Sequence, residues 1–99
     1  MHTQMTTIDI TQAHRLPKDE AVRALERLVR QLQDRYKLGV EWRGEVLHFG
    51  GPGLDGTVEV HEHHVHIVVT LGALLSVMKP KIERKISAGL QKLLAGPGG

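Results

Sequence analysis

The chain has 99 residues, of which 40% are hydrophobic and 24% are charged, with 13 Lys and Arg against 11 Asp and Glu. This composition excludes disordered, collagen-like and low-complexity chains and predicts one small globular domain over residues 1–99, with 1–5 and 96–99 as frayed tails. The absence of cysteine excludes disulfide scaffolds, thiolate zinc sites and cysteine nucleophiles, and it fits a reducing cytoplasm.

The charge pattern and the apolar runs limit the class of partner. The formal net charge is only +2, and basic and acidic residues alternate along most of the chain, so long-range attraction for nucleic acid is small. No apolar run approaches the roughly 20 residues that span a bilayer, and the first twelve residues lack the pattern of a secretory signal. We therefore expect a cytoplasmic protein with no nucleic-acid partner and no transmembrane segment.

The first half of the chain predicts a strand, a helix and a hairpin. Residues 6–13 alternate between apolar and polar side chains, as a half-buried strand does. Apolar residues then recur every three or four positions, which predicts a helix that begins near Pro17 and is capped by Gly39 in a left-handed conformation. Residues 40–49 alternate on both sides of Gly44, which predicts two short strands or a tight hairpin, and GGPG at 50–53 predicts a loop.

The second half predicts two more strands and a second helix. Residues 57–60 and 64–71 alternate, whereas residues 71–79 fit either the end of a strand or the approach to a helix. Pro80 disfavours a helical conformation at Lys79, so we expect the second helix to begin near Pro80.

The order β-α-β-β-β-β-α predicts an α+β fold, an antiparallel sheet of four to five strands with two helices on one face. The strand residues expected to face the helices are Ile8, Ile10, Val40, Trp42, Leu47, Phe49, Val58, Val60, Val65, Ile67, Val69 and Leu71. The other face would carry Asp9, Glu41, Arg43, Val46, His48, Thr57, Glu59, His66, Val68 and Thr70.

The segment HEHHVH, residues 61–66, holds four of the seven histidines. If Glu62 and His63 form a turn, His61 faces His64 and the valines on both strands face the core. A zinc ion could then be held by side chains on the solvent face, namely Glu59, His61, His64 and His66, and His48 has the same parity on a neighbouring strand. We prefer an exposed polar hairpin face with no metal and no other cofactor, because no surrounding residues are evident that would orient the imidazole rings.

The sequence contains no catalytic constellation, so we predict a protein that is not an enzyme. A serine elbow motif is absent, and GGPGLDG lacks the lysine and the following helix of a phosphate-binding loop. His14 precedes the first predicted helix, and we expect it to anchor the strand-to-helix corner through a backbone hydrogen bond.

The chain resembles the bacterial polyhydroxyalkanoic acid system family. The matching segments are Ile8-x-Ile10 with His14, Leu16, Glu20 and Ala21; Trp42-x-Gly44-x-x-Leu47-x-Phe49; Gly56-x-Val58-x-Val60; and LGALLSVMKPKIERKI at 71–86. The GGPG loop and the histidine-rich turn depart from the family pattern. The resemblance implies a cytoplasmic bacterial protein of storage-polyester metabolism with a setting at the granule surface, and it supplies no active-site residues.

The function predicted on this basis is a non-enzymatic accessory or binding protein of polyhydroxyalkanoate metabolism, with the granule surface or granule proteins as partners. An apolar segment containing Leu74, Leu75, Val77 and Met78 precedes a basic helix and could lie on that surface, although we prefer packing of this segment in the core. The candidate ligand- or surface-binding residues are Trp42, Phe49, Leu74, Leu75 and Met78.

Two alternative functions and the formation of a homodimer remain open. The chain could carry a lipid or acyl ligand in a groove between sheet and helices, or bind a metal through the histidine hairpin. A homodimer through the open sheet face or an edge strand would also help so small a core.

Overall fold

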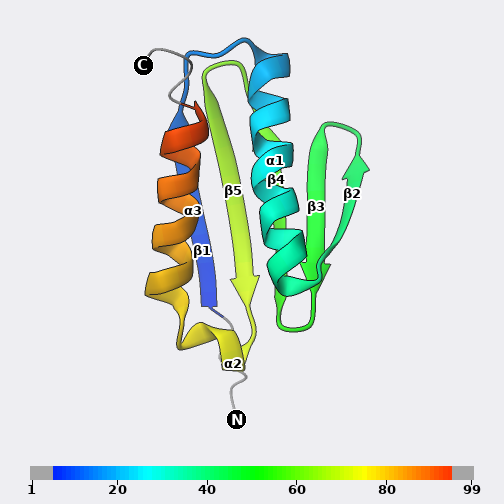
Figure 1. Ribbon diagram of the computed structural model, residues 1–99, viewed down its shortest axis with the longest axis vertical. Helices are drawn as coiled ribbons and strands as arrows, with labels where there is room; N and C mark the ends of the chain where they lie inside the picture. The colour runs from blue at the N-terminus through cyan, green and yellow to red at the C-terminus, as the bar shows by residue number, and fades with distance from the viewer. Residues whose placement is uncertain (1–5, 95–99) are drawn as a thin grey trace.

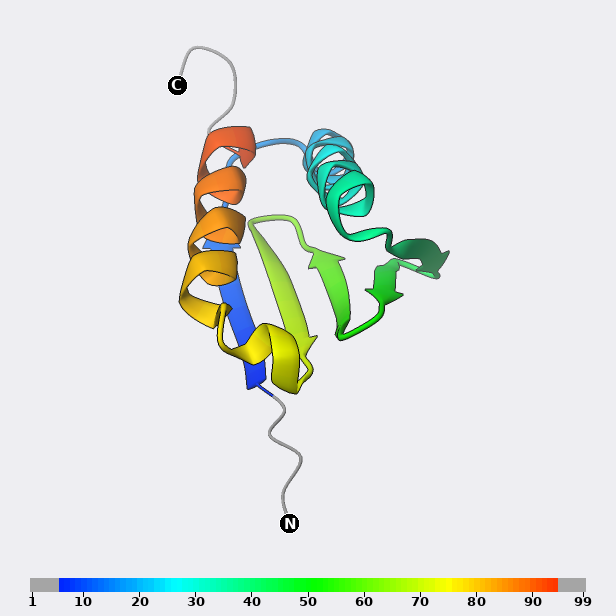
Figure 2. The same cartoon turned by 60° about the horizontal axis from the view of Figure 1, so that its bottom comes forward.

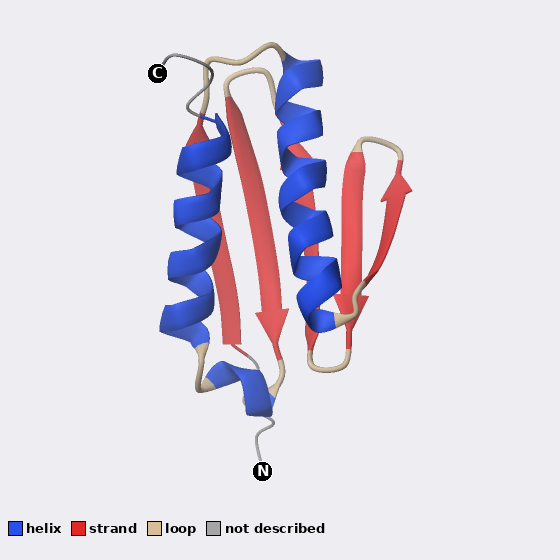
Figure 3. Cartoon of the chain, viewed as in Figure 1, coloured by secondary structure: helices blue, strands red, loops and turns tan. Residues whose placement is uncertain are grey.

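The sheet in this protein has five strands, all antiparallel, in the order β1-β5-β4-β3-β2 (Figures 1 and 3). The computed structural model describes residues 6–94. The elements in chain order are β1 (Thr6–Ala13), α1 (Lys18–Tyr36), β2 (Gly39–Arg43), β3 (Val46–Gly51), β4 (Leu54–Val60), β5 (His64–Leu71), α2 (Ala73–Ser76) and α3 (Lys79–Leu94). The predicted α+β fold and element order are confirmed, with the one-turn helix α2 as an addition. The predicted tails at 1–5 and 96–99 lie outside the described residues.

Strand register follows the alternation of apolar and polar residues. One row across the helix-side face joins Ile10, Ile67, Val58, Leu47 and Trp42, and the row behind it on the open face joins Asp9, Val68, Thr57, His48 and Glu41. A shift of one residue in any strand would turn its apolar side chains toward water, so burial on one face fixes the register.

The core lies between the sheet and the helices. Gly56 is needed there, because an added Cβ would lie 2.7 Å from Phe49 Cε2 and 2.8 Å from the carbonyl oxygen of Val68. The buried apolar residues are Ile8, Ala21, Ala24, Leu25, Leu28, Val29, Leu38, Leu47, Phe49, Leu54, Val58, Val60, Val65, Ile67, Val69, Leu71, Ile82, Ile86, Leu90 and Leu94.

The end of helix α1 differs from its prediction. The left-handed residue is Lys37, with φ of 54°, and its N–H donates to the carbonyl oxygen of Gln33 at 2.8 Å. The expectation that Gly39 caps the helix was therefore wrong. The chain needs Leu38 in the core and Gly39 as the first residue of β2, so the helix ends two residues earlier.

Two other boundaries are also corrected. Gly50 and Gly51 continue β3, opposite Asp55 and Leu54, so only Pro52 and Gly53 of the predicted GGPG loop form the turn. Helix α3 begins at Lys79, one residue before the expected start, with Pro80 in the first turn, where its missing N–H is not needed.

The helices do not cover the whole sheet. Helix α3 lies along β1 and α1 lies over β4, whereas β2 lies beyond both helices (Figures 1 and 2). Val40 and Trp42 were expected to face the helices, and their parity is as predicted, but each is 38% exposed. The five-stranded sheet is wider than the two long helices together, so the edge strand β2 is left uncovered on the helix side.

Candidate functional site

The histidine-rich hairpin has the predicted register. Val60 lies opposite Val65 and Glu59 lies opposite His66, while Glu62 and His63 form the turn. The backbone N–H of His61 donates to the carbonyl oxygen of His64 at 2.8 Å, which closes the hairpin. The apolar half of this hairpin builds the core, and its polar half lies on the open face.

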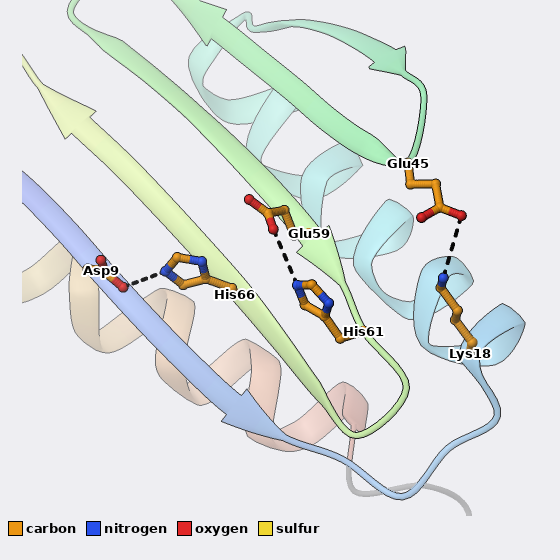
Figure 4. Close-up of polar contacts among 6 residues, drawn as sticks. All are labelled: Asp9, Lys18, Glu45, Glu59, His61 and His66. Carbon is orange, nitrogen blue, oxygen red and sulfur yellow. Dashed lines mark hydrogen bonds and ion pairs between the residues drawn. The ribbon is translucent and has the colours of Figure 1, made fainter.

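The polar side chains of the hairpin separate into two groups (Figure 4). The His61 ring stacks on the His64 ring with centroids 4.4 Å apart. The Nε2–H of His61 donates to Glu59 Oε1 at 3.3 Å. His66 instead donates from Nε2 to Asp9 Oδ1 at 2.7 Å, across to strand β1. The four predicted metal-ligand candidates are thus not directed at one point.

Residues 6–94 contain no group of three or more His, Asp and Glu side chains arranged to hold a metal ion. His48 lies opposite Thr57 in β4, and Thr57 precedes His61 by four residues. At about 3.3 Å per residue, His48 is therefore displaced from His61 by roughly 13 Å along the strand direction. The hairpin and His48 therefore form separate features of the open face.

His14 is the one polar residue buried in the described part of the chain, at 5% exposure. Its backbone N–H donates to the carbonyl oxygen of His63 at 2.9 Å, and its Nε2–H donates to that of His61 at 2.8 Å. The prediction that His14 anchors the strand-to-helix corner through backbone hydrogen bonding is confirmed.

The predicted surface-binding residues divide into exposed and buried sets. Leu74 is 85% exposed, Trp42 is exposed and Met78 is just at the surface, whereas Phe49 is in the core and Leu75 packs against it. The preferred prediction, that the whole 74–78 segment packs in the core, was wrong for Leu74, for Val77, which is 81% exposed, and for Met78, which is 36% exposed. A helix of one turn can direct only one side inward, and Leu75 occupies that side.

The space between sheet and helices is nearly filled. The apolar cavity bounded by Leu32, Phe49 and Ile86 measures about 20 Å³, against several hundred Å³ for a typical ligand pocket. A wider and more open concavity, about 580 Å³, lies on the open sheet face, where Glu41, Arg43 and Asp55 are among its lining residues. Alternation placed those residues on one face, but only the curvature of the assembled sheet makes the surface hollow.

None of the helices formed by residues 6–94 is long and apolar enough to cross a membrane. Their apolar stripes, such as Leu25 and Leu28 in α1 and Ile82 and Ile86 in α3, pack on the sheet.

The comparisons with known proteins identify a family. The chain has no match among the curated proteins or among the solved structures. One family model, described as "Putative polyhydroxyalkanoic acid system protein", matches residues 8–94. The match covers both apolar stripes, the whole sheet from Ile8 onward and the α2 segment. The chain therefore belongs to the polyhydroxyalkanoic acid system family.

Proposed function

We propose that this chain is a non-enzymatic binding protein of polyhydroxyalkanoate metabolism that attaches to the polyester granule in the bacterial cytoplasm. Family membership over residues 8–94 supports the metabolic setting. The observation that carries the attachment is the exposure of two large aliphatic side chains, Leu74 and Val77, at one end of the molecule. We call the segment Ala73–Met78 the α2 tip.

The α2 tip holds these side chains in a defined position. Ser76 Oγ donates to the carbonyl oxygen of Gly72 at 2.8 Å, and the N–H of Ser76 donates to the same oxygen at 2.9 Å. Leu75 packs against the core and lies next to the turn at Gly53. A turn fixed on its inner side presents Leu74 and Val77 outward at little further cost in conformational entropy.

The chemistry of the tip suits a polyester surface. Burying a Leu or Val side chain fully is worth about 1.5–3 kcal/mol, and the tip leaves most of that contribution unused. A polymer of hydroxyalkanoic acids offers alkyl segments for these side chains and carboxylates at its chain ends. The exposed cations Lys81 and Arg84, in the first two turns of α3, fit such carboxylates.

The non-enzymatic part of the proposal rests on where the polar residues lie. The contacts of His61 with Glu59 and of His66 with Asp9 are on the solvated face of the sheet. Catalytic charge stabilisation works best in a site that excludes water. An open polar face fits binding better than catalysis.

Co-sedimentation with isolated polyester granules tests the attachment. We expect the wild-type chain to pellet with granules and the double variant Leu74→Ser/Val77→Ser to bind at least about tenfold more weakly, because two aliphatic contacts are lost. Val46→Ser is the matched control, since it removes an aliphatic side chain from the open face of β3 and leaves the tip intact.

Each outcome has a distinct meaning. A wild-type chain that stays wholly in the soluble fraction, with no granule-protein partner, would refute the attachment. Weaker binding by Val46→Ser with full binding by the double variant would transfer the contact to the open sheet face.

A further inference from the structure

Strand β2 is an edge of the sheet with an uncovered outer side. The sheet order ends at β2, and all five of its residues are exposed. Its pairing with β3 runs without a bulge from Gly39 to Arg43. Natural edge strands are commonly protected by charged side chains, especially lysine, by proline or by a bulge. Strand β2, with the sequence GVEWR, has no lysine, proline or bulge, and its charged residues are one of each sign, Glu41 and Arg43.

The two edges of the sheet differ in how far their apolar side chains are covered. On β1, Ile8 is fully buried beside α3. On β2, Val40 and Trp42 lie on the helix side of the sheet and remain 38% exposed, because neither long helix extends over them (Figure 1). The β2 edge therefore combines an unpaired backbone with apolar side chains that lack a cover.

We propose that β2 pairs with β2 of a second copy of this chain, antiparallel, about a two-fold axis through Trp42. In this register Trp42 lies opposite Trp42 of the second copy, and Glu41 lies opposite Arg43 on the open face. Two ion pairs then form across the interface, and a continuous ten-stranded sheet results. Within one chain the same two side chains already form an exposed ion pair, Arg43 Nε to Glu41 Oε2 at 2.8 Å.

The charge pattern selects this register over its neighbour. If the helices of both copies are to lie on one side of the joint sheet, residues on the same face must lie opposite each other. The two-fold axis must then pass through a residue of β2, and the next possible position is one residue away. An axis through Glu41 would place two glutamates directly opposite each other, which is destabilising in a sheet. The axis through Trp42 replaces that repulsion with two attractive pairs.

The backbone geometry fits the same register. The two-residue turn at Gly44 and Glu45 closes on Arg43 and Val46, which lie opposite each other. Backbone groups in an antiparallel strand point alternately toward and away from the neighbour, so those of Trp42 and Val40 point outward. The outward groups of Trp42 then meet their equivalents on the axis, and the two indole rings come within contact distance.

This association goes beyond attachment to granules and does not depend on it. The test is sedimentation equilibrium of the full purified chain over a concentration series, with fluorescence of the single tryptophan as a second readout. A five-residue edge buries little area, so we expect a weak dimer that dissociates on dilution. Dissociation should shift the Trp42 emission to longer wavelength.

Charge variants test the register. Glu41→Arg and Arg43→Glu each place like charges opposite one another in the homodimer, and each should weaken self-association at least about tenfold. Mixing the two variants should restore the dimer as a heterodimer, and the double exchange Glu41→Arg/Arg43→Glu should restore the homodimer. Circular dichroism confirms that each variant is folded.

Three results would overturn the proposal. These are a wild-type chain that stays monomeric at every concentration, a dimer that neither single variant weakens, and a mixture of the two single variants that associates no better than either alone.

Discussion

One glycine, Gly56, makes room in the core for the side chain of Phe49 on the neighbouring strand. On the helix side of the sheet, Gly56 lies directly opposite Phe49, and the aromatic ring occupies the space that a side chain on Gly56 would need. Phe49 is buried in the core as a consequence. Because Gly56 has no Cβ, the ring of Phe49, the largest side chain of the core, can lie against strand β4.

Gly56→Ala should destabilise the fold by about 1–3 kcal/mol, the usual cost of overpacking a core. The added methyl group would meet the carbonyl oxygen of Val68, which is backbone and cannot rotate away. Urea denaturation measures the change. Gly39→Ala is the control, because its Cβ would meet nothing closer than the carbonyl oxygen of Gly50 at 3.7 Å, and its effect should stay within about 0.5 kcal/mol. Equal stability of the two variants would refute this account of Gly56.

At the scale of elements, the strands were predictable and the α2 tip was not. Alternation fixed the two faces of β4 and β5 because every one-residue slip exposes valines, and the structure has that register. In the 74–78 segment, four apolar residues in five predicted core packing, since sequence alone does not show that the long helices already pack over β1 and β4. Only Leu75 finds room beside them.

The histidine hairpin shows the same limit in a polar setting. Parity placed His61, His64 and His66 on one face correctly. Parity does not fix side-chain direction, and the partner of His66 is Asp9, 57 positions away in the sequence. That contact depends on the pairing of the first strand with the last, which local spacing cannot reveal.

Ser76→Ala should loosen the α2 tip while leaving the rest of the fold nearly intact. The variant loses the single Oγ–H donor, which lies 2.8 Å from the carbonyl oxygen of Gly72 and 3.3 Å from that of Leu71, and one such hydrogen bond is worth about 0.5–1.5 kcal/mol. We expect faster amide hydrogen exchange at residues 73–78 and unchanged exchange in β5. Ser87→Ala, a serine removal inside α3, is the matched control. Uniformly faster exchange throughout the molecule would show that the tip is not a separate unit.

The whole molecule has three surfaces of different character. The long helices pack over β1 and β4, the open sheet face is mostly polar, and among residues 6–94 the large apolar side chains that stay exposed lie at the β2 edge and at the α2 tip. The tip lies at the carboxyl end of β5, between β5 and the start of α3 (Figure 1). Strand β2 lies at the sheet edge opposite β1. A dimer through β2 would leave both tips uncovered, and its two-fold axis, which is perpendicular to the sheet, would place the two tips at opposite ends of the joint sheet.

Ion pairs at the surface add little to this arrangement. Lys18 Nζ lies 3.7 Å from Glu45 Oε1, between the start of α1 and the β2–β3 turn (Figure 4). Such exposed pairs contribute about 0–1 kcal/mol. The arrangement of the molecule is therefore set by apolar packing and by strand pairing.

Adsorption of the purified chain to a protein-free polyhydroxyalkanoate film, followed on a quartz crystal microbalance, tests the central claim most directly, because no granule protein can mediate the contact. We predict that the wild-type chain adsorbs, that Val46→Ser adsorbs equally, and that Leu74→Ser/Val77→Ser adsorbs at least about tenfold more weakly. Equal adsorption of the double variant and the wild-type chain, or no adsorption of either, would contradict direct attachment through the α2 tip.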